Sequence, residues 1–274
     1  MRPRKKRRLL GLLAALALLL GLVAADSNLR LVTTHYRLSF PGLPAGFAGY
    51  RILQLSDLHG AVFGTDNARL LAAVRATEPD LIALTGDLAD ESTDLAVIDA
   101  LLGQLTAIAP VYYVSGNHEW AARRLDSLIP LLERHGVRYL RNEWTLLERG
   151  GDSIVLLGVE DPCGPADMPK PDAVAAAAPE GFRLMLGHRN DLAELYPDLP
   201  VDLLLVGHAH GGIWRIPGVG GLLDHNFRLF PDDAEGLVVS GRLHMLVSRG
   251  LGNIGISFRL LNNPELVLVT LHRA

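Results

Sequence analysis

Short apolar runs recur along the chain after residue 50 and set the pattern of predicted strands. They read "RILQLS", "DLIALTG", "VYYVSG", "SIVLLGV", "FRLMLG", "DLLLVG", "LHMLVS" and "ELVLVTL". Near-continuous apolar runs of this length are typical of strands that are buried on both faces. Segments with helical spacing accompany the first three runs, at Asn67–Thr77, Asp94–Ala107 and Ala121–His135. The pattern predicts an α/β domain that is at least partly parallel in its first half, with antiparallel additions where later strands follow more closely.

The N-terminal residues have a different pattern. Residues 2–8 carry six positive charges, and Leu9–Ala25 contains no charged or polar side chain. As a helix, this run would be ~25 Å long, near the short end of what spans a bilayer. It is either a membrane anchor or the apolar region of a cleaved signal peptide, with "VAA" before Asp26 as the cleavage site. The run exceeds the ~7–15 residues usual for a signal peptide, which favours the anchor. The basic end would stay in the cytoplasm, so the rest of the chain would be exported.

The pattern divides the chain into three parts. Residues 1–25 are the basic N-terminus with the anchor or signal segment, 26–50 are an extended lead-in with a Pro/Gly turn, and 51–274 are the main domain. About 250 residues follow the anchor, which is enough for one large α/β domain with a substantial core. Residues 222–245 suggest only a loop and a hairpin. The single cysteine, Cys163, excludes an internal disulfide framework, and no feature indicates a protein partner.

The charge balance argues against one class of partner. The chain carries 26 basic and 30 acidic residues, and the first 25 residues hold six of the basic ones and none of the acidic ones. The remainder therefore has 20 basic against 30 acidic residues, a net charge of −10. A sequence-independent nucleic-acid binder needs a basic face, so no nucleic-acid partner is expected. A phosphate-bearing substrate would have to be attracted by local positive charge, such as that of a metal ion.

Polar residues gather where the predicted strands end. They are Asp57 and His59 in "SDLHG", Asp87 and Asp90 in "TGDLAD", Asn117 and His118 in "SGNHE", His188 in "LGHRN", and His208 and His210 in "VGHAHGG". Open α/β sheets place their ligands at the carboxyl ends of the strands, so these residues are expected to converge on one rim. A glycine directly before four of these motifs would let the backbone turn sharply after each strand.

Each motif alone also has an ordinary explanation, because D-x-H, G-D and a histidine after a strand occur in loops that bind nothing. The set is more specific, since five of the ten histidines occupy these strand-end positions. Carboxylate, imidazole and amide ligands suit Mn²⁺, Fe²⁺ or Zn²⁺, and the lack of cysteine argues against a structural zinc site. These nine residues offer more ligands than one small ion can take. Two ions ~3.5–4 Å apart can use seven of them if one carboxylate bridges. The sequence therefore predicts a dinuclear metal site.

The ordered series D-x-H, G-D-x-x-D, G-N-H-E, G-H and G-H-x-H resembles the calcineurin-like metallophosphoesterase superfamily, over residues 51 to about 212. The wider pattern resembles the bacterial, membrane-anchored YaeI/YkuE-type phosphodiesterase branch. Its features are "LQLSDLHG", "HAHGGIWRIPG", "SRGLG" and the terminal "NNPELVLVTL", all after an N-terminal anchor. The resemblance implies a β-sandwich flanked by helices, in the layer order αββα, for the catalytic domain at 51–274.

The resemblance also implies a role for each strand-end residue. One metal would be bound by Asp57, His59 and His210, the other by Asn117, His188 and His208, and Asp87 would bridge the two. His118 would not be a ligand but the general acid near the leaving oxygen, and Asp90 would orient it. An imidazole that is held by a carboxylate beside a dinuclear cation site can protonate a departing alkoxide.

The implied function is a dinuclear phosphoesterase in which metal-bound hydroxide attacks a phosphodiester or pyrophosphate in line. The anchor suggests a lipid or envelope-precursor substrate and a place in the bacterial inner membrane, with the catalytic domain on the exported side. The alternatives are a phosphomonoesterase or nucleotidase, because the same metals serve both reactions, and a non-catalytic metal-binding scaffold. The scaffold is disfavoured because a degenerate site should have lost ligands, and none of the expected ones is missing.

Some neighbours of the motifs depart from the branch and affect the substrate surface more than the metals. The chain has "GHAHGGI" and "HRND" where the branch often carries "GHTHGGQ" and "HNPD". Arg189 and Arg249 would either pair with a substrate phosphate or form ordinary ion pairs with nearby acids. The segment 211–223 follows the last ligand and contains Trp214. It is either part of a rim facing the membrane or a loop folded back on the core.

Overall fold

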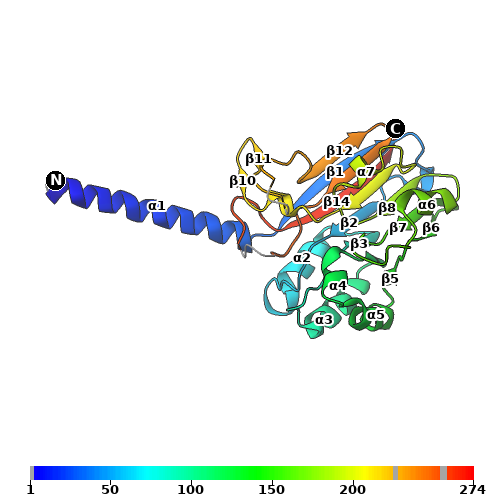
Figure 1. Cartoon of the computed structure of the whole chain (residues 1–274), viewed down its shortest axis with the longest axis horizontal. Coiled ribbons are helices and arrows are strands. Elements are labelled where there is room, and N and C mark those ends of the chain that lie inside the picture. Colours follow the sequence, from blue (N-terminus) through cyan, green and yellow to red (C-terminus); the bar gives the residue numbers. More distant parts are fainter. Residues whose placement is uncertain (1–2, 225–227, 254–257) are drawn as a thin grey trace.

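A long N-terminal helix, α1 (Pro3–Leu29), projects from a folded body that contains the rest of the chain (Figure 1). The computed structural model describes residues 3–224, 228–253 and 258–274. Within α1, the 21 residues Leu9–Leu29 have a mean hydropathy of 2.4, which makes the helix long and apolar enough to cross a membrane. The predicted apolar run is therefore helical, and the helix continues four residues beyond Ala25.

Six strands form the first sheet, in the order β1-β14-β2-β3-β4-β5. They are β1 (Val32–Phe40), β14 (Glu265–Arg273), β2 (Arg51–Leu55), β3 (Leu81–Thr85), β4 (Val111–Val114) and β5 (Arg138–Tyr139). Strands β2 to β5 are mutually parallel, as the pattern of the first half predicts. Strand β14 runs antiparallel to β2 and parallel to β1, so the last strand of the chain lies between the first two.

Six further strands form the second sheet, in the order β12-β13-β9-β8-β7-β6. They are β12 (Gly236–Ser240), β13 (Leu243–Val247), β9 (Leu203–Val206), β8 (Arg183–Leu186), β7 (Asp152–Gly158) and β6 (Glu143–Arg149). Only the outer strands β6 and β12 are antiparallel to their neighbours. The predicted antiparallel additions are thus wrong for β7, β8, β9 and β13, which are parallel to one another, whereas β14 is antiparallel to β2 as predicted. The connections between these strands, although short of helix, are long enough for a crossover.

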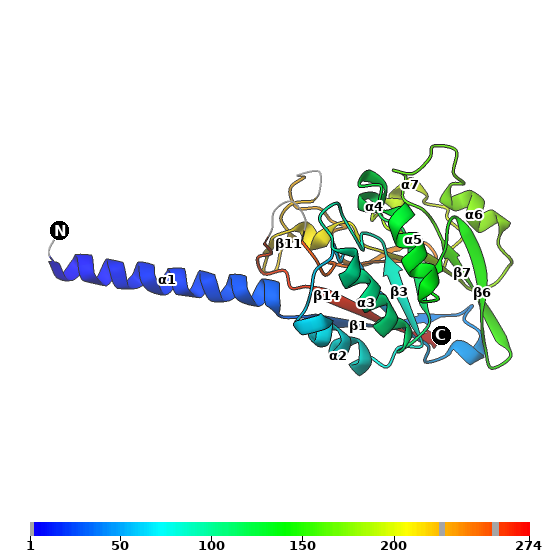
Figure 2. The same ribbon diagram turned by 90° about the horizontal axis from the view of Figure 1, so that it is seen from below.

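Helices cover the outer face of each sheet, and three apolar cores separate the four layers. The first sheet carries α2 (Ala68–Ala76), α3 (Leu95–Thr106) and α5 (Leu125–Arg134), which lie together on one side in Figure 2. The second carries α6 (Pro171–Ala177) and α7 (Leu192–Leu195). In β2, Leu53 and Leu55 face the helices, whereas Ile52 faces the other sheet. This alternation of side chains produces the predicted αββα order.

The predicted helices match α2, α3 and α5, but α5 begins only at Leu125 because Asn117–Ala121 form a separate short helix, α4. Strand β1 comes from the segment predicted to be an extended lead-in. The possible hairpin within 222–245 is found as β12 and β13, and residues 225–227 of that segment lie outside the described residues. A second, two-stranded hairpin joins β10 (Arg215–Ile216) to β11 (Gly220–Gly221).

The end of α1 is hydrogen-bonded to the body. The Leu261 N–H donates to Ser27 Oγ at 2.8 Å, and Ser27 is 1% exposed. The Asn28 side chain accepts from Arg259 N–H at 2.8 Å and donates to Arg259 O at 2.9 Å. Strands β1 and β14 begin beside this attachment, and β2, antiparallel to β14, ends there. The helix therefore joins the body at the end of the first sheet where β2, β3 and β4 terminate.

Candidate metal centre

The carboxyl ends of five strands meet at one rim, where the predicted site residues lie in the connecting loops. Strands β2, β3 and β4 of the first sheet and β8 and β9 of the second all end here. The loops after them carry Asp57 and His59, Asp87 and Asp90, Asn117 and His118, His188, and His208 and His210. The structure thus brings together residues that are separated by more than 150 positions in the sequence.

One group of three side chains joins the loops after β2 and β9. The ligand atoms of Asp57, His59 and His210 all lie within 4.8 Å of one another. His210 Nε2 is 3.6 Å from Asp57 Oδ1, and the rings of His59 and His210 stack with centroids 5.2 Å apart. All three residues are buried, at 8% exposure or less. This is the set that the family resemblance implies for one metal.

A second group joins the loops after β3, β4, β8 and β9. The ligand atoms of Asp87, His188 and His208 also lie within 4.8 Å of one another. His188 Nε2 is 3.1 Å from Asn117 Oδ1, 3.2 Å from His208 Nδ1 and 3.2 Å from Asp87 Oδ2. Four predicted ligands therefore point at one small volume, and this is the set implied for the other metal.

Asp87 lies between the two groups. Its Oδ2 atom is 3.2 Å from His188 Nε2 in the second group and 3.6 Å from His59 Nε2 in the first. The side chain is 1% exposed, so the carboxylate is shielded from water. A single carboxylate oxygen that faces imidazoles of both groups has the position that a bridging ligand requires.

The residues fit a divalent ion in each group. Ligand atoms ~2.0–2.2 Å from one ion lie roughly 3.0–3.5 Å from each other. The separations of 3.1–3.2 Å around His188 agree with this range, and the 3.6 Å between His210 Nε2 and Asp57 Oδ1 lies just above it. Both ring nitrogens of His59 are buried without a hydrogen-bond partner among the described residues, an arrangement that is costly for a polar ring unless an ion is bound. Imidazole, carboxylate and amide oxygen without thiolate form a donor set for borderline or hard ions.

The electrostatics of the ligand side chains are consistent with this fit. Burial raises the pKa of Asp57 to about 6 and lowers the pKa of His59 to about 4. Burial also acts to lower the pKa of His188, but the Asp87 carboxylate outweighs it and raises that pKa to about 10. A proton on His188 therefore neutralises Asp87, and a bound cation would replace that proton.

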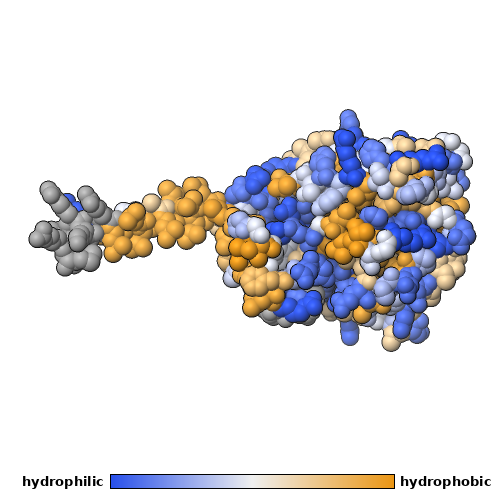
Figure 3. All heavy atoms as spheres, turned by 90° about the horizontal axis from the view of Figure 1, so that it is seen from above, coloured by the Kyte–Doolittle hydropathy of each residue, from blue (hydrophilic) through white to orange (hydrophobic). Residues whose placement is uncertain are grey.

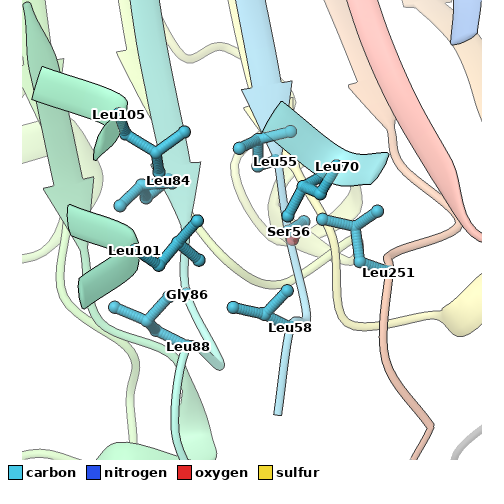
Figure 4. A pocket seen from close by; sticks show the side chains of 10 residues that line it. All are labelled: Leu55, Ser56, Leu58, Leu70, Leu84, Gly86, Leu88, Leu101, Leu105 and Leu251. Atoms are coloured by element: carbon cyan, nitrogen blue, oxygen red, sulfur yellow. The ribbon is translucent and has the colours of Figure 1, made fainter. Parts of the chain in front are cut away.

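The backbone of the ligand loops is unusual. Five of the seven predicted ligands have positive φ, namely Asp57 (51°), His59 (47°), Asp87 (52°), His208 (68°) and His210 (48°). Positive φ is uncommon for residues other than glycine, and such strain is typical of functional sites. The intervening leucines hold two of the loops in place. Leu58 and Leu88 lie in the apolar layer under the rim, where α2 and α3 contribute further leucines (Figure 4).

The glycines before the ligands are needed mainly for space. Of the four glycines predicted to permit sharp turns, only Gly86 has a positive φ, at 84°. Gly116 is extended, with φ of −107°, but a Cβ there would collide with the Asp87 carboxylate. A Cβ at Gly207 would likewise collide with Asp57. The close approach of neighbouring loops therefore explains these glycines better than turning does.

Glu119 positions two of the ligand loops, a role that the sequence motifs did not indicate. Its carboxylate is fully buried and accepts from three backbone N–H groups, those of Asp87 (3.0 Å), Ala89 (2.9 Å) and Gly116 (2.7 Å). Burial, followed by the charge of Asp87, raises the pKa of Glu119 to about 7. One side chain thus fixes the loops after β3 and β4 to each other. The sequence feature that could have indicated this role is the glutamate that ends the G-N-H-E motif.

His118 and Asp90 both lie beside His59. The half-buried His118 packs its ring edge-on against His59, with centroids 4.9 Å apart, and its backbone N–H donates to Asp87 Oδ1 at 2.9 Å. The Asp90 carboxylate accepts from Ser92 and Thr93 and lies 3.8 Å from His59 Nδ1. Those neighbours do not include His118, so the orienting role of Asp90 stays a prediction.

The two arginines next to the motifs form ion pairs with nearby acids. Arg189 makes a two-point contact with the buried Asp161, at 2.8 and 3.1 Å, and approaches His208 Nε2 at 3.5 Å. Arg249 Nη2 donates to Glu265 at 3.0 Å. Of the two interpretations of these arginines, the structure thus shows the ion pairs.

Comparison with known proteins identifies the family. The profile of the calcineurin-like phosphoesterases matches residues 50–212, more than half of the chain and all of the predicted ligands. The chain belongs to the calcineurin-like phosphoesterase family. This membership confirms the resemblance of the motif series, and it makes the chain a metal-dependent phosphoric ester hydrolase that binds divalent metal.

Relatives of this phosphoesterase share most of its length. The metallophosphoesterase YkuE of Bacillus subtilis is 30% identical, covering 87% of this chain and 85% of YkuE. Phosphodiesterase YaeI of Escherichia coli is 32% identical, covering 82% and 83% of the two chains. A zebrafish transmembrane protein with a metallophosphoesterase domain is 28% identical, covering 85% of this chain and 55% of that protein. The predicted YaeI/YkuE branch is therefore confirmed.

Proposed function

We propose that this phosphoesterase holds two divalent ions and hydrolyses a phosphodiester or pyrophosphate bond. The observation that carries the proposal is Asp87, whose Oδ2 faces His188 of one ligand group and His59 of the other. A shared carboxylate makes the two groups one dinuclear site, with Asp57 and His210 completing the first group. Mn²⁺, Fe²⁺ and Zn²⁺ suit these ligands.

In hydrolysis, separate side chains bind the metal ions, donate a proton to the leaving oxygen and orient the proton donor. When bound, two such metal ions lower the pKa of a water molecule and neutralise charge on the phosphoryl oxygens. His118 is half-buried at the edge of the site, so its ring can reach the leaving oxygen and donate a proton to it. The hydrogen bond from the His118 backbone N–H to Asp87 keeps this residue next to the ligands. Asp90 orients the imidazole once substrate is bound.

The site and the helix together indicate the substrate and the location. A phosphodiester is favoured because the relative YaeI is a phosphodiesterase. Helix α1 anchors the chain in the inner membrane of a bacterium, and the basic residues 2–8 before its apolar span keep the catalytic domain on the exported side. A phosphoester in a membrane lipid or an envelope precursor would then be within reach.

The test is metal-dependent turnover of the purified full chain in detergent. After chelation, the protein is reconstituted separately with Mn²⁺, Fe²⁺, Zn²⁺ and Mg²⁺ and given bis-p-nitrophenyl phosphate or p-nitrophenyl phosphate. We expect one ion to restore diester cleavage, Asp87→Asn to abolish it, and the exposed Asp126→Asn to leave it unchanged. Preference for the monoester would replace the diester proposal with a phosphomonoesterase. Two bound ions without turnover of either compound or of a panel of lipid phosphoesters would indicate a binding module.

A further inference from the structure

The body exposes large apolar side chains around the base of α1. Leu29, Ile216, Val219, Phe258 and Leu261 are exposed to 60%, 39%, 63%, 45% and 43% of their surface. We call these five residues the apolar collar. They come from three segments: the end of α1, the β10–β11 hairpin and the chain before β14. Large apolar groups that gather at one end of a domain mark an interaction surface.

Backbone hydrogen bonds and ring packing join the three segments. The Arg215 N–H of β10 donates to Leu260 O at 3.0 Å, and the Trp214 ring lies 5.4 Å from the Phe258 ring. The hairpin therefore sits on the segment that contains Phe258 and Leu261. The same segment holds α1, because Leu261 N–H donates to Ser27 Oγ. The collar is thus a continuous part of the body around the exit of the helix.

The collar continues the apolar surface of α1. The candidate span runs to Leu29, which is itself a collar residue. Figure 3 shows the apolar surface of the helix and further apolar surface on the end of the body that it enters. A helix of this length fills the hydrocarbon core, so its last residues lie at the interface between lipid and water. The collar side chains lie at that same level, and Trp214, a residue type that is enriched there, packs against the collar residue Phe258.

One buried side chain connects the collar to the metal centre. Asn262, next to Leu261, is fully buried and donates to His210 O at 2.7 Å and to Ile213 O at 3.0 Å. The segment that carries two collar residues therefore also holds the backbone of a predicted metal ligand. A body that rests on the collar would keep the metal centre close to the lipid headgroups, where phosphoesters of lipids lie.

We propose that the apolar collar is a membrane-docking surface that inserts into the leaflet facing the domain. The occupant is the phospholipid bilayer itself, because the collar adjoins the span. Docking adds to the proposed function a fixed orientation: the body does not swing freely on α1 but lies with its metal centre toward the lipid. The inference rests on the proposed anchoring by α1 and is independent of hydrolysis.

The experiment measures the depth of three positions in nanodiscs of phosphatidylethanolamine and phosphatidylglycerol. Single-cysteine full chains in a Cys163→Ser background carry a nitroxide at Leu16→Cys in the span, Val219→Cys in the collar or Val239→Cys. Val239 is a matched control, because it is 55% exposed and apolar but lies in β12, near the far end of the second sheet. Depth is read as accessibility to oxygen, which enters lipid, relative to a water-soluble nickel complex.

We expect positions 16 and 219 to show a severalfold higher ratio of oxygen to nickel accessibility than position 239. A nitroxide that lies in lipid at position 16 but in water at position 219 would overturn docking, although the proposed anchoring by α1 would still hold. Water around position 16 would overturn both. A second measurement places the label at Ile216→Cys and adds a charge: Val219→Asp should lift position 216 toward water, and Val239→Asp should not. An unchanged depth at 216 with Val219→Asp would also overturn the proposal.

Discussion

Replacing Glu119 should destabilise the chain through backbone amides that lose their acceptor. In Glu119→Ala, the N–H groups of Asp87, Ala89 and Gly116 would be left without the carboxylate in a fully buried place. Each buried, unsatisfied donor costs ~1–3 kcal/mol, so the three together cost roughly 3–9 kcal/mol. A domain has only ~5–15 kcal/mol of total stability, so this change should bring the chain close to unfolding.

Glu119→Gln separates the contribution of each oxygen. Oε2 accepts from Asp87 and Gly116, whereas Oε1 accepts from Ala89 alone. A Gln oxygen in the Oε2 position keeps two bonds, and its amide group opposes the Ala89 N–H, so the loss should be about one unsatisfied donor, ~1–3 kcal/mol.

The assay is urea unfolding of the full chain in detergent with chelator present, followed by metal content after reconstitution. Glu148→Ala, at an exposed glutamate of β6, is the control and should change stability little. The expected order of stability is wild type, Gln, then Ala, with metal binding weakest in Ala because the Asp87 loop is released. An Ala variant within about 1 kcal/mol of the control would refute the reasoning, since it would mean that those amides find other partners or water.

Three further outcomes follow from the same structure. His118→Ala should lower turnover by roughly 10²–10⁴-fold with metal content near wild type, and the exposed His35→Ala should not; loss of metal would show that His118 is a ligand. Trp214→Ala should depress hydrolysis of a lipid phosphoester more than that of a soluble aryl diester, with Trp144→Ala as control, and equal losses would contradict this. Burial, together with the nearby Asp161 charge, raises the pKa of the Cys163 thiol. The rate of its alkylation should therefore rise at higher pH than the rate for a cysteine peptide. Alkylation rates with the same pH dependence in both would exclude the shift.

Local patterns in the sequence predicted an α/β domain and the strand-end residues, because residue type and periodicity carry that information, whereas the αββα layer order came from the family resemblance. The groups around Asp57 and around His188 contain the residues that the motif series named. Pairing between distant strands is not encoded locally, so the place of β14 between β1 and β2 was not predicted. The same holds for Glu119 and Asn262, whose importance comes from backbone groups that they meet only after folding. A polar residue in a motif does not reveal which backbone groups its side chain will contact after folding.

The position of β14 has a consequence for the order in which the enzyme matures. Strand β14 fills the gap between β1, which directly follows α1, and β2, which carries Asp57 at its end. The first sheet therefore stays divided until residues 265–273 have been made and, for an exported domain, moved across the membrane. Glu265 and the preceding Asn262 also brace Arg249 and His210. Under the proposed export, metal loading should thus come after translocation is finished, so that no active phosphoesterase would form on the cytoplasmic side.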